Sequence, residues 1–155
     1  MNIEPLAGTL LACSHGKMAI RRGQTLVLKT SEGETVLDDG TKYGAWAQAV
    51  FGYEGKAVVT LTEQGHRVKV WIFDSDEPQQ RMRFSPKAVL LVADDTLIAI
   101  AREDGEVVVI SWSVMPFARI PPQVVGKAVS RIDITGDTSL VITYGDESVV
   151  VNLRP

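Results

Sequence analysis

Residues 102–112 read REDGEVVVISW, a short polar turn followed by a run of β-branched residues that ends on Trp112. Gly and acidic residues favour turns, whereas Val and Ile favour strands. Such a stretch is typical of one arm of a β-hairpin. Whether it occurs once or is one copy of a repeat decides the fold class.

The stretch recurs along the chain. Residues 57–71, 96–110 and 139–151 align as a strand, a polar turn that contains Gly, and a second β-branched strand. A weaker copy covers residues 17–29. Helical periodicity is hard to find between these copies. The sequence therefore predicts an all-β fold built from four copies of one unit.

Each copy extends beyond its hairpin. An apolar strand precedes every copy, at residues 6–13, 47–51, 88–92 and 129–134. A more polar strand follows the first three copies, at residues 34–37, 81–84 and 117–120. The fourth copy stops without such an outer strand.

Four-stranded antiparallel sheets that repeat at about 40 residues are the blades of a β-propeller. We therefore predict one β-propeller-like domain over residues 1–155, with about four blades of four-stranded antiparallel sheet, the last of which lacks its outer strand. The predicted blades cover approximately residues 6–37, 44–84, 86–120 and 128–153.

Two stretches carry a family resemblance. Residues 67–71, RVKVW, are similar to the third-strand signature of WD-repeat propellers, and residues 101–105, AREDG, to that family's turn between second and third strands. The family's Trp-Asp dipeptide is Trp71-Ile72 here, and Gly65-His66 stands in a hairpin turn instead of before a first strand. The chain thus resembles WD-repeat β-propeller proteins over nearly its whole length.

Within that family, residues 24–28 and 49–114 are similar in pattern to the amino-terminal half of the non-catalytic WD-repeat subunit of tRNA guanine-N7 methyltransferase. This second likeness implies an RNA-associated role and no catalytic activity for the chain itself.

The unfinished fourth blade predicts a binding edge. A sheet that ends open leaves backbone N–H and C=O groups unpaired, and proteins seldom leave such an edge unprotected. We predict a partner-binding edge at Val149, Val150 and Val151. Four arrangements would account for it: a ring closed by residues 1–5, a homodimer of two four-blade halves, a protein partner that supplies further blades, or a chain that is a fragment. The first functional hypothesis is a non-enzymatic protein-interaction scaffold.

The charges suggest a second hypothesis. The net charge of -3, from 16 basic and 19 acidic residues, gives no general attraction to nucleic acid. A local patch would bind RNA phosphates in a salt-dependent way. The chain would then be an RNA-associated non-catalytic subunit of an RNA-modifying enzyme such as a tRNA methyltransferase. The candidate basic rim comprises Arg21, Arg22, Arg81, Arg83 and Lys87. The alternative role of these charges is to keep outer strands from pairing with other chains.

No catalytic or metal-binding constellation is visible in the sequence. His15 and His66 stand in predicted turns without a second ligand at metal-binding spacing. Residues 74–77, DSDE, lack the Gly and the distant Glu of a calcium loop. No serine stands in a nucleophile elbow, and Cys13 lacks a plausible base close by in the pattern. We therefore expect no enzymatic activity, no metal and no cofactor.

Three further expectations follow from composition. Trp46, Trp71 and Trp112 are expected to pack between sheets rather than to act as interface anchors. A single cysteine, Cys13, excludes an internal disulfide and favours a cytoplasmic location. No apolar run approaches the roughly 18 residues of a membrane-spanning helix, so no membrane association is expected.

Overall fold

The computed structural model describes residues 1–42, 44–73, 80–112, 118–136 and 138–153. All regular structure in these ranges is β-strand. They contain no helix long and apolar enough to cross a membrane. The calcium-loop candidate at residues 74–77 lies outside the described residues, as do Phe117 of a predicted outer strand and Asp137 of a predicted turn.

The strands form four antiparallel sheets, here called blades 1 to 4, in which strand order follows the chain. Blade 1 contains β1 (Thr9–Ser14), β2 (Lys17–Arg22), β3 (Thr25–Thr30) and β4 (Gly33–Asp38). Blade 2 contains β5 (Trp46–Gly52), β6 (Ala57–Thr62), β7 (Arg67–Ile72) and β8 (Gln80–Arg83). Blade 3 contains β9 (Ala88–Ala93), β10 (Leu97–Arg102), β11 (Val107–Ser111) and β12 (Ala118–Ile120). Blade 4 contains β13 (Val129–Ile134), β14 (Ser139–Tyr144) and β15 (Glu147–Asn152).

This topology confirms the predicted fold class. Three blades have four strands and the last has three. The repeated hairpins of the sequence are the two middle strands of blades 1 to 3 and the last two strands of blade 4. The repeat was visible because these strands are rich in β-branched and other apolar residues, and those of blades 2 and 3 are largely buried.

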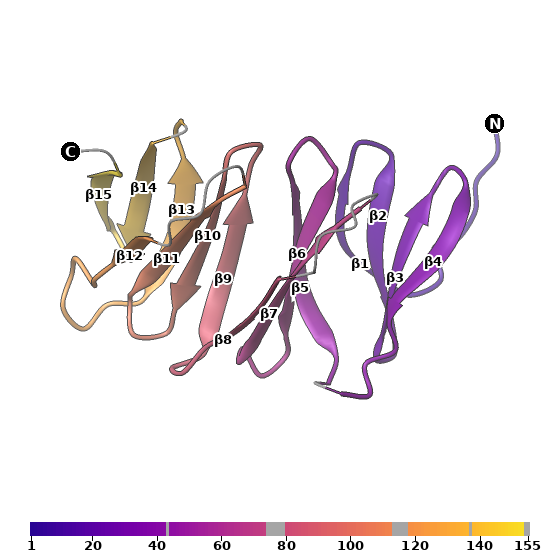
Figure 1. The fold of residues 1–155 in the computed structure, drawn as a ribbon, viewed down its shortest axis with the longest axis horizontal. Helices are drawn as coiled ribbons and strands as arrows, with labels where there is room; N and C mark the ends of the chain where they lie inside the picture. Colours follow the sequence, from indigo (N-terminus) through magenta and orange to yellow (C-terminus); the bar gives the residue numbers. More distant parts are fainter. Residues whose placement is uncertain (43, 74–79, 113–117, 137, 154–155) are drawn as a thin grey trace.

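The blades stand in a row in chain order (Figure 1). The first strand of each blade lies beside the first strand of the next, so that β1, β5, β9 and β13 follow one another along the row. Blade 1 and blade 4 lie at opposite ends. Residues 1–5 have no regular structure and lie at the blade 1 end, so they do not supply the outer strand of blade 4. The closed four-blade ring, one of the predicted arrangements, is therefore not the one found.

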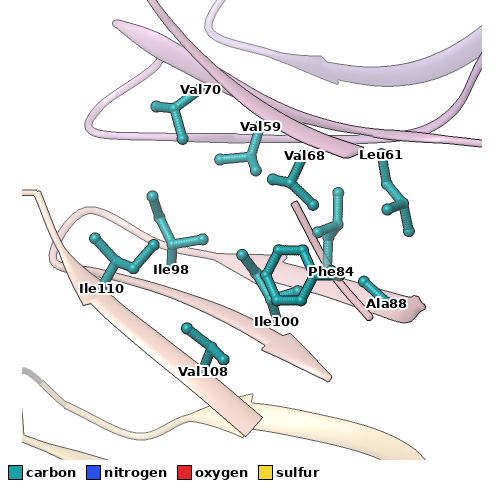
Figure 2. Close-up of a cluster of buried hydrophobic side chains, with 11 residues drawn as sticks. Val59, Leu61, Val68, Val70, Phe84, Ala88, Ile98, Ile100, Val108 and Ile110 are labelled. Carbon is teal, nitrogen blue, oxygen red and sulfur yellow. The ribbon is translucent and has the colours of Figure 1, made fainter. Parts of the chain in front are cut away.

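The hydrophobic core is divided among the contacts between neighbouring blades. One cluster joins blades 1 and 2, with Ala19 and Leu26 of blade 1 packed with Trp46 and Trp71 of blade 2. A second joins blades 2 and 3, where side chains of β6 and β7 face those of β10 and β11 (Figure 2). A third joins blades 3 and 4 and includes Leu140 and Ile142. Each blade is therefore stabilised by its neighbours along the row.

Strand β10 shows how the two faces of a blade are used. Ile98 and Ile100 belong to the cluster shared with blade 2, whereas Leu97, Ala99 and Ala101 belong to the cluster shared with blade 4. All five side chains are buried. Successive residues of a strand point to opposite faces, so a strand covered on both sides is apolar at every position.

Candidate interaction site

Strand β15 is the edge of blade 4. It pairs with β14 on one side, where Val150 lies opposite Val141 and Val149 opposite Ile142. No described strand pairs with its other side, whereas β4, β8 and β12 occupy the corresponding place in the other blades. An antiparallel edge strand carries N–H and C=O groups that point away from its only neighbour. The outer side of β15 can therefore receive hydrogen bonds from another strand.

The three valines predicted as the binding edge do not present their side chains to one surface. Val149 and Val151 are half-buried and pack against the cluster between blades 3 and 4. Val150 points to the opposite face and is 74% exposed. The predicted edge is consequently a line of backbone groups with one exposed aliphatic side chain.

The face of blade 4 that points away from blade 3, here called the C-terminal end face, is largely polar. The hydroxyl oxygens of Thr143 and Ser148 lie 2.9 Å apart across β14 and β15. An ion pair of 2.9 Å joins Arg131 Nε to Asp133 Oδ2 on β13. Faces buried between blades carry mostly aliphatic and aromatic side chains. The C-terminal end face therefore lacks the apolar surface of an internal blade contact.

The opposite end of the row, the face of blade 1 away from blade 2, has an apolar line across its four strands. Across the paired strands, Leu10 lies opposite Ile20, Ile20 opposite Val27, and Val27 opposite Val36. Ile20 and Val27 at the centre are 0% and 3% exposed, whereas Leu10 and Val36 are 44% and 62% exposed. Something must cover the centre of this N-terminal end face.

The cover includes the chain segment before β1. A Cβ at Gly8 would lie 2.9 Å from Ile20 Cγ2, and the φ of +110° also requires glycine. Arg22 Nε donates a 2.7 Å hydrogen bond to the carbonyl oxygen of Ala7. The two terminal nitrogens of Arg22 donate to Glu34 on β4 at 2.6 and 2.7 Å. These hydrogen bonds lower the pKa of Glu34 and raise that of Arg22.

The five residues of the predicted basic rim do not form one surface. Arg21 and Arg22 are consecutive on β2 and point to opposite faces of blade 1. Arg21 Nη1 lies 3.6 Å from Glu63 Oε1 of blade 2, and Arg22 is held by Glu34. Both cations are thus ion-paired. Arg81 and Arg83 are exposed on β8, and Lys87 is exposed in the segment between β8 and β9.

A denser basic cluster, which the sequence reasoning missed, lies on blade 2. Lys69 stands opposite Arg81, and Arg67 stands opposite Arg83, on the paired strands β7 and β8. Lys69 Nζ lies 3.6 Å from the centre of the Trp71 ring. The alternating pattern of both strands was visible in the sequence, but only their register shows that like charges face each other. Such opposition is unfavourable for folding by itself.

The tryptophans pack between sheets, as predicted, although Trp112 is only half-buried. Trp46 and Trp71 are buried and meet edge to face, with ring centres 6.3 Å apart. Trp71 Nε1 donates a 2.9 Å hydrogen bond to the buried hydroxyl of Thr60. Trp112 Nε1 donates at 2.8 Å to the carbonyl of Asp94. Each polar ring atom thus has a partner, which buried tryptophans generally require.

The two histidines have local partners. His15 Nδ1 lies 2.7 Å from Ser14 Oγ, and His66 Nδ1 lies 2.8 Å from the carbonyl oxygen of Phe84. Among the described residues, no three His, Cys, Asp or Glu side chains come together in a way that could hold a metal ion.

No protein-family model and no curated protein matches the chain. Solved structures do match. A chain of the mitotic checkpoint complex superimposes with a TM-score of 0.71 at 12% identity over 99% of this chain and 50% of its own length. The β-propeller domain of Cps50 (Swd1) from Myceliophteria thermophila gives 0.69 at 15% identity over 98% and 54%. The computationally designed Ika4 protein gives 0.68 at 15% identity over 98% and 96%.

Identities this low establish the fold alone. The chain spans about half the length of the first two matched chains, and nearly all of the designed one. The comparisons confirm, at the level of the fold, the resemblance to WD-repeat β-propellers that the sequence predicted.

Proposed function

We propose that the chain is a non-enzymatic protein-interaction scaffold whose binding element is the outer edge of β15. The observation that carries the proposal is the three-stranded blade 4 beside three blades of four strands. A strand from another protein, added to β15, would complete the blade through backbone hydrogen bonds. The exposed Val150 would lie beside the side chains of the added strand.

Two features favour a partner protein over a second copy of this chain. A ring made of two copies would press the C-terminal end face of one copy against the N-terminal end face of the other. The first carries the Thr143–Ser148 hydroxyl pair and the Arg131–Asp133 ion pair. The second is covered at its centre near Gly8. Burial of polar groups without new hydrogen bonds is unfavourable.

The first test is the mass of the purified chain in solution, measured by light scattering behind a sizing column over a range of concentrations. We expect a monomer of 16.9 kDa. A dimer that strengthens with concentration would support completion by self-association and contradict the proposed partner strand.

The second test locates the binding surface. Peptides selected from a random library for binding to the chain should slow hydrogen exchange of the outward amides of β15. The matched comparison is β4, the outer strand of blade 1, whose exchange should not change. Peptides that protect other elements and leave β15 unchanged would refute the edge as the binding element.

An RNA-associated role is the second hypothesis, and the basic cluster of Arg67, Lys69, Arg81 and Arg83 favours it. Four phosphate contacts would weaken binding about 100-fold between 50 and 200 mM salt. Gel-shift titrations with tRNA at the two salt concentrations test this. Arg81→Gln should weaken binding, whereas Lys29→Gln on blade 1 should not. A chain that binds no tRNA at 50 mM salt would exclude the hypothesis.

A further inference from the structure

The register of blade 4 shows which backbone groups of β15 point outward. The backbone N–H of Leu153 donates a 2.6 Å hydrogen bond to the carbonyl oxygen of Thr138. From there the ladder between β14 and β15 continues without a register shift. Hydrogen-bonded and non-hydrogen-bonded pairs alternate in an antiparallel ladder. The backbone groups that point away from β14 are therefore those of Ser148, Val150 and Asn152.

Blade 3 shows how an outer strand is attached at the same place. Arg119 of β12 lies opposite Val108 of β11. Its Nη1 donates a 3.2 Å hydrogen bond to Glu106 Oε1, two residues before Val108. Diagonal neighbours of this kind are within reach of long side chains. Arg102 contacts the same Glu106 oxygen at 3.3 Å and Asp104 at 2.6 Å. Two cations thus balance two carboxylates at this corner of blade 3.

Blade 4 repeats this arrangement without the outer strand. Val149 on β15 is the counterpart of Val108 on β11, because both belong to the third strand of a blade and both pack against the preceding blade. Glu147 stands two residues before Val149, as Glu106 stands two residues before Val108. A side chain on an added strand, opposite Val149, would therefore lie diagonal to Glu147.

The carboxylates beside the start of β15 share one cation. Lys127 Nζ lies 3.2 Å from Asp146 Oδ1 and 3.3 Å from Glu147 Oε1. In the part of the chain that the structure describes, neither carboxylate forms an ion pair with a second cation. The Glu147 side chain is 58% exposed, and a carboxylate can accept several hydrogen bonds. This corner thus lacks one positive charge relative to blade 3, where the outer strand supplies it.

We propose that the strand added to β15 is antiparallel and carries an arginine or lysine opposite Val149. Its cation pairs with Glu147 as Arg119 pairs with Glu106, and its backbone bonds to the outward groups of β15. The partner is therefore a protein with a basic side chain on the strand face that points toward blade 3. This inference rests on the proposed function, to which it adds the chemistry of the partner.

The test uses three synthetic peptides, acetyl-Thr-Val-Xaa-Val-Thr-amide, in which Xaa is arginine, glutamine or valine. Amide resonances of Ser148, Val150 and Asn152, followed by NMR at constant ionic strength, report binding at the edge. The arginine peptide should bind about threefold more tightly than the glutamine peptide, as expected for one exposed ion pair. This preference should disappear in Glu147→Gln. It should persist in the matched control Glu32→Gln, which removes the same charge from an exposed turn of blade 1.

The possible failures are distinguishable. Peptides that leave the three outward amides unshifted would refute strand addition at β15 and, with it, this inference. Equal binding of the arginine and glutamine peptides, with the amides shifted, would leave strand addition standing and overturn the basic side chain. A preference that persists in Glu147→Gln would indicate general attraction to an acidic chain and would overturn it too. Tightest binding of the valine peptide would assign the edge to an aliphatic strand instead.

Discussion

At the residue scale, the best-defined polar contact of the core is the hydrogen bond from Trp71 to Thr60. Thr60 is 0% exposed, and its hydroxyl also lies 3.3 Å from the carbonyl of Lys69. Thr60 is on β6 and Trp71 is on β7, the two central strands of blade 2. Water therefore cannot replace the Thr60 hydroxyl as the acceptor for the indole N–H. The contact therefore links tryptophan burial to the pairing of β6 with β7.

Thr60→Val keeps the shape of the side chain and leaves the indole N–H without an acceptor. We expect the free energy of unfolding to fall by about 1–3 kcal/mol, measured by urea denaturation. The matched control is Thr60→Val combined with Trp71→Phe, which removes the donor as well. The combined loss should be smaller than the sum of the single losses. Strict additivity would show that the bond contributes nothing.

The Arg22–Glu34 pair predicts a pH dependence. The pKa of Glu34 is lowered from its ordinary value of 4.5, chiefly by the hydrogen bonds from Arg22. A carboxyl group whose pKa is lower in the folded chain stabilises the fold above its unfolded pKa, and this contribution disappears as the pH falls through the folded value. The stability difference between the native chain and Glu34→Gln should therefore be constant above pH 4.5 and vanish in acid.

Glu32→Gln provides the control for this experiment, because Glu32 is exposed in the turn between β3 and β4. Its effect on unfolding should be small at every pH. A Glu34→Gln effect that stays constant down to strongly acidic pH would contradict the role of the ion pair.

Single residues also show where sequence reasoning succeeds and fails. Packing of Trp46, Trp71 and Trp112 between sheets could be predicted, because a large aromatic side chain in an apolar strand is normally covered by a neighbouring sheet. The opposition of Arg67 to Arg83 and of Lys69 to Arg81 could not be predicted, because it depends on the register between β7 and β8.

At the scale of elements, strand centres were predicted better than strand ends. The predicted first strand began at residue 6, whereas β1 begins at Thr9. Gly8, at a φ of +110°, turns the preceding segment onto the N-terminal end face. The outer strand of blade 2 was predicted at residues 81–84, whereas β8 runs one residue earlier, at Gln80–Arg83. Strand ends are set by turns and by tertiary contacts that hydrophobic patterning does not report.

Strand β15 allows a direct test of its two faces. Val151→Ala should lower the free energy of unfolding by about 1–2 kcal/mol, since its side chain packs between blades 3 and 4. Val150→Ala, one residue earlier and 74% exposed, should change it by less than about 0.5 kcal/mol. Chemical denaturation of both variants provides the measurement. Equal losses would contradict the assignment of the two side chains to opposite faces, and a larger loss in Val150→Ala would indicate a register shifted by one residue.

At the scale of the whole molecule, the open row makes the blades unequal. Blades 2 and 3 are packed on both faces, whereas blade 4 has one neighbour and three strands. Local opening is easiest where fewest buried contacts are lost. Native-state hydrogen exchange should therefore show β14 opening at a lower free energy than β6 and β10, the corresponding strands of the middle blades. Uniform protection would indicate that the row unfolds only as a unit.

The number of blades was predictable from the sequence, but their arrangement as an open row was not. The number of copies of the strand-and-turn repeat predicts the number of sheets. Whether the first and last sheets meet depends on the end faces, and these become visible only when strand register assigns Thr143 and Ser148 to one side and Ile142 and Val149 to the other.

The two-sided burial of β10 determines how that strand keeps its register. In a sheet with one exposed face, a register shift of one residue would turn charged side chains into the core. The cost of burying those charges would be enough to prevent the shift. β10 reads Leu-Ile-Ala-Ile-Ala before Arg102, so a slip would exchange one aliphatic face for another. What differs between its faces is volume: the alanines face blade 4 and the isoleucines face blade 2. In the middle of this molecule, alignment is encoded by the alternation of small and large side chains, and a misaligned strand is rejected by steric overlap and voids.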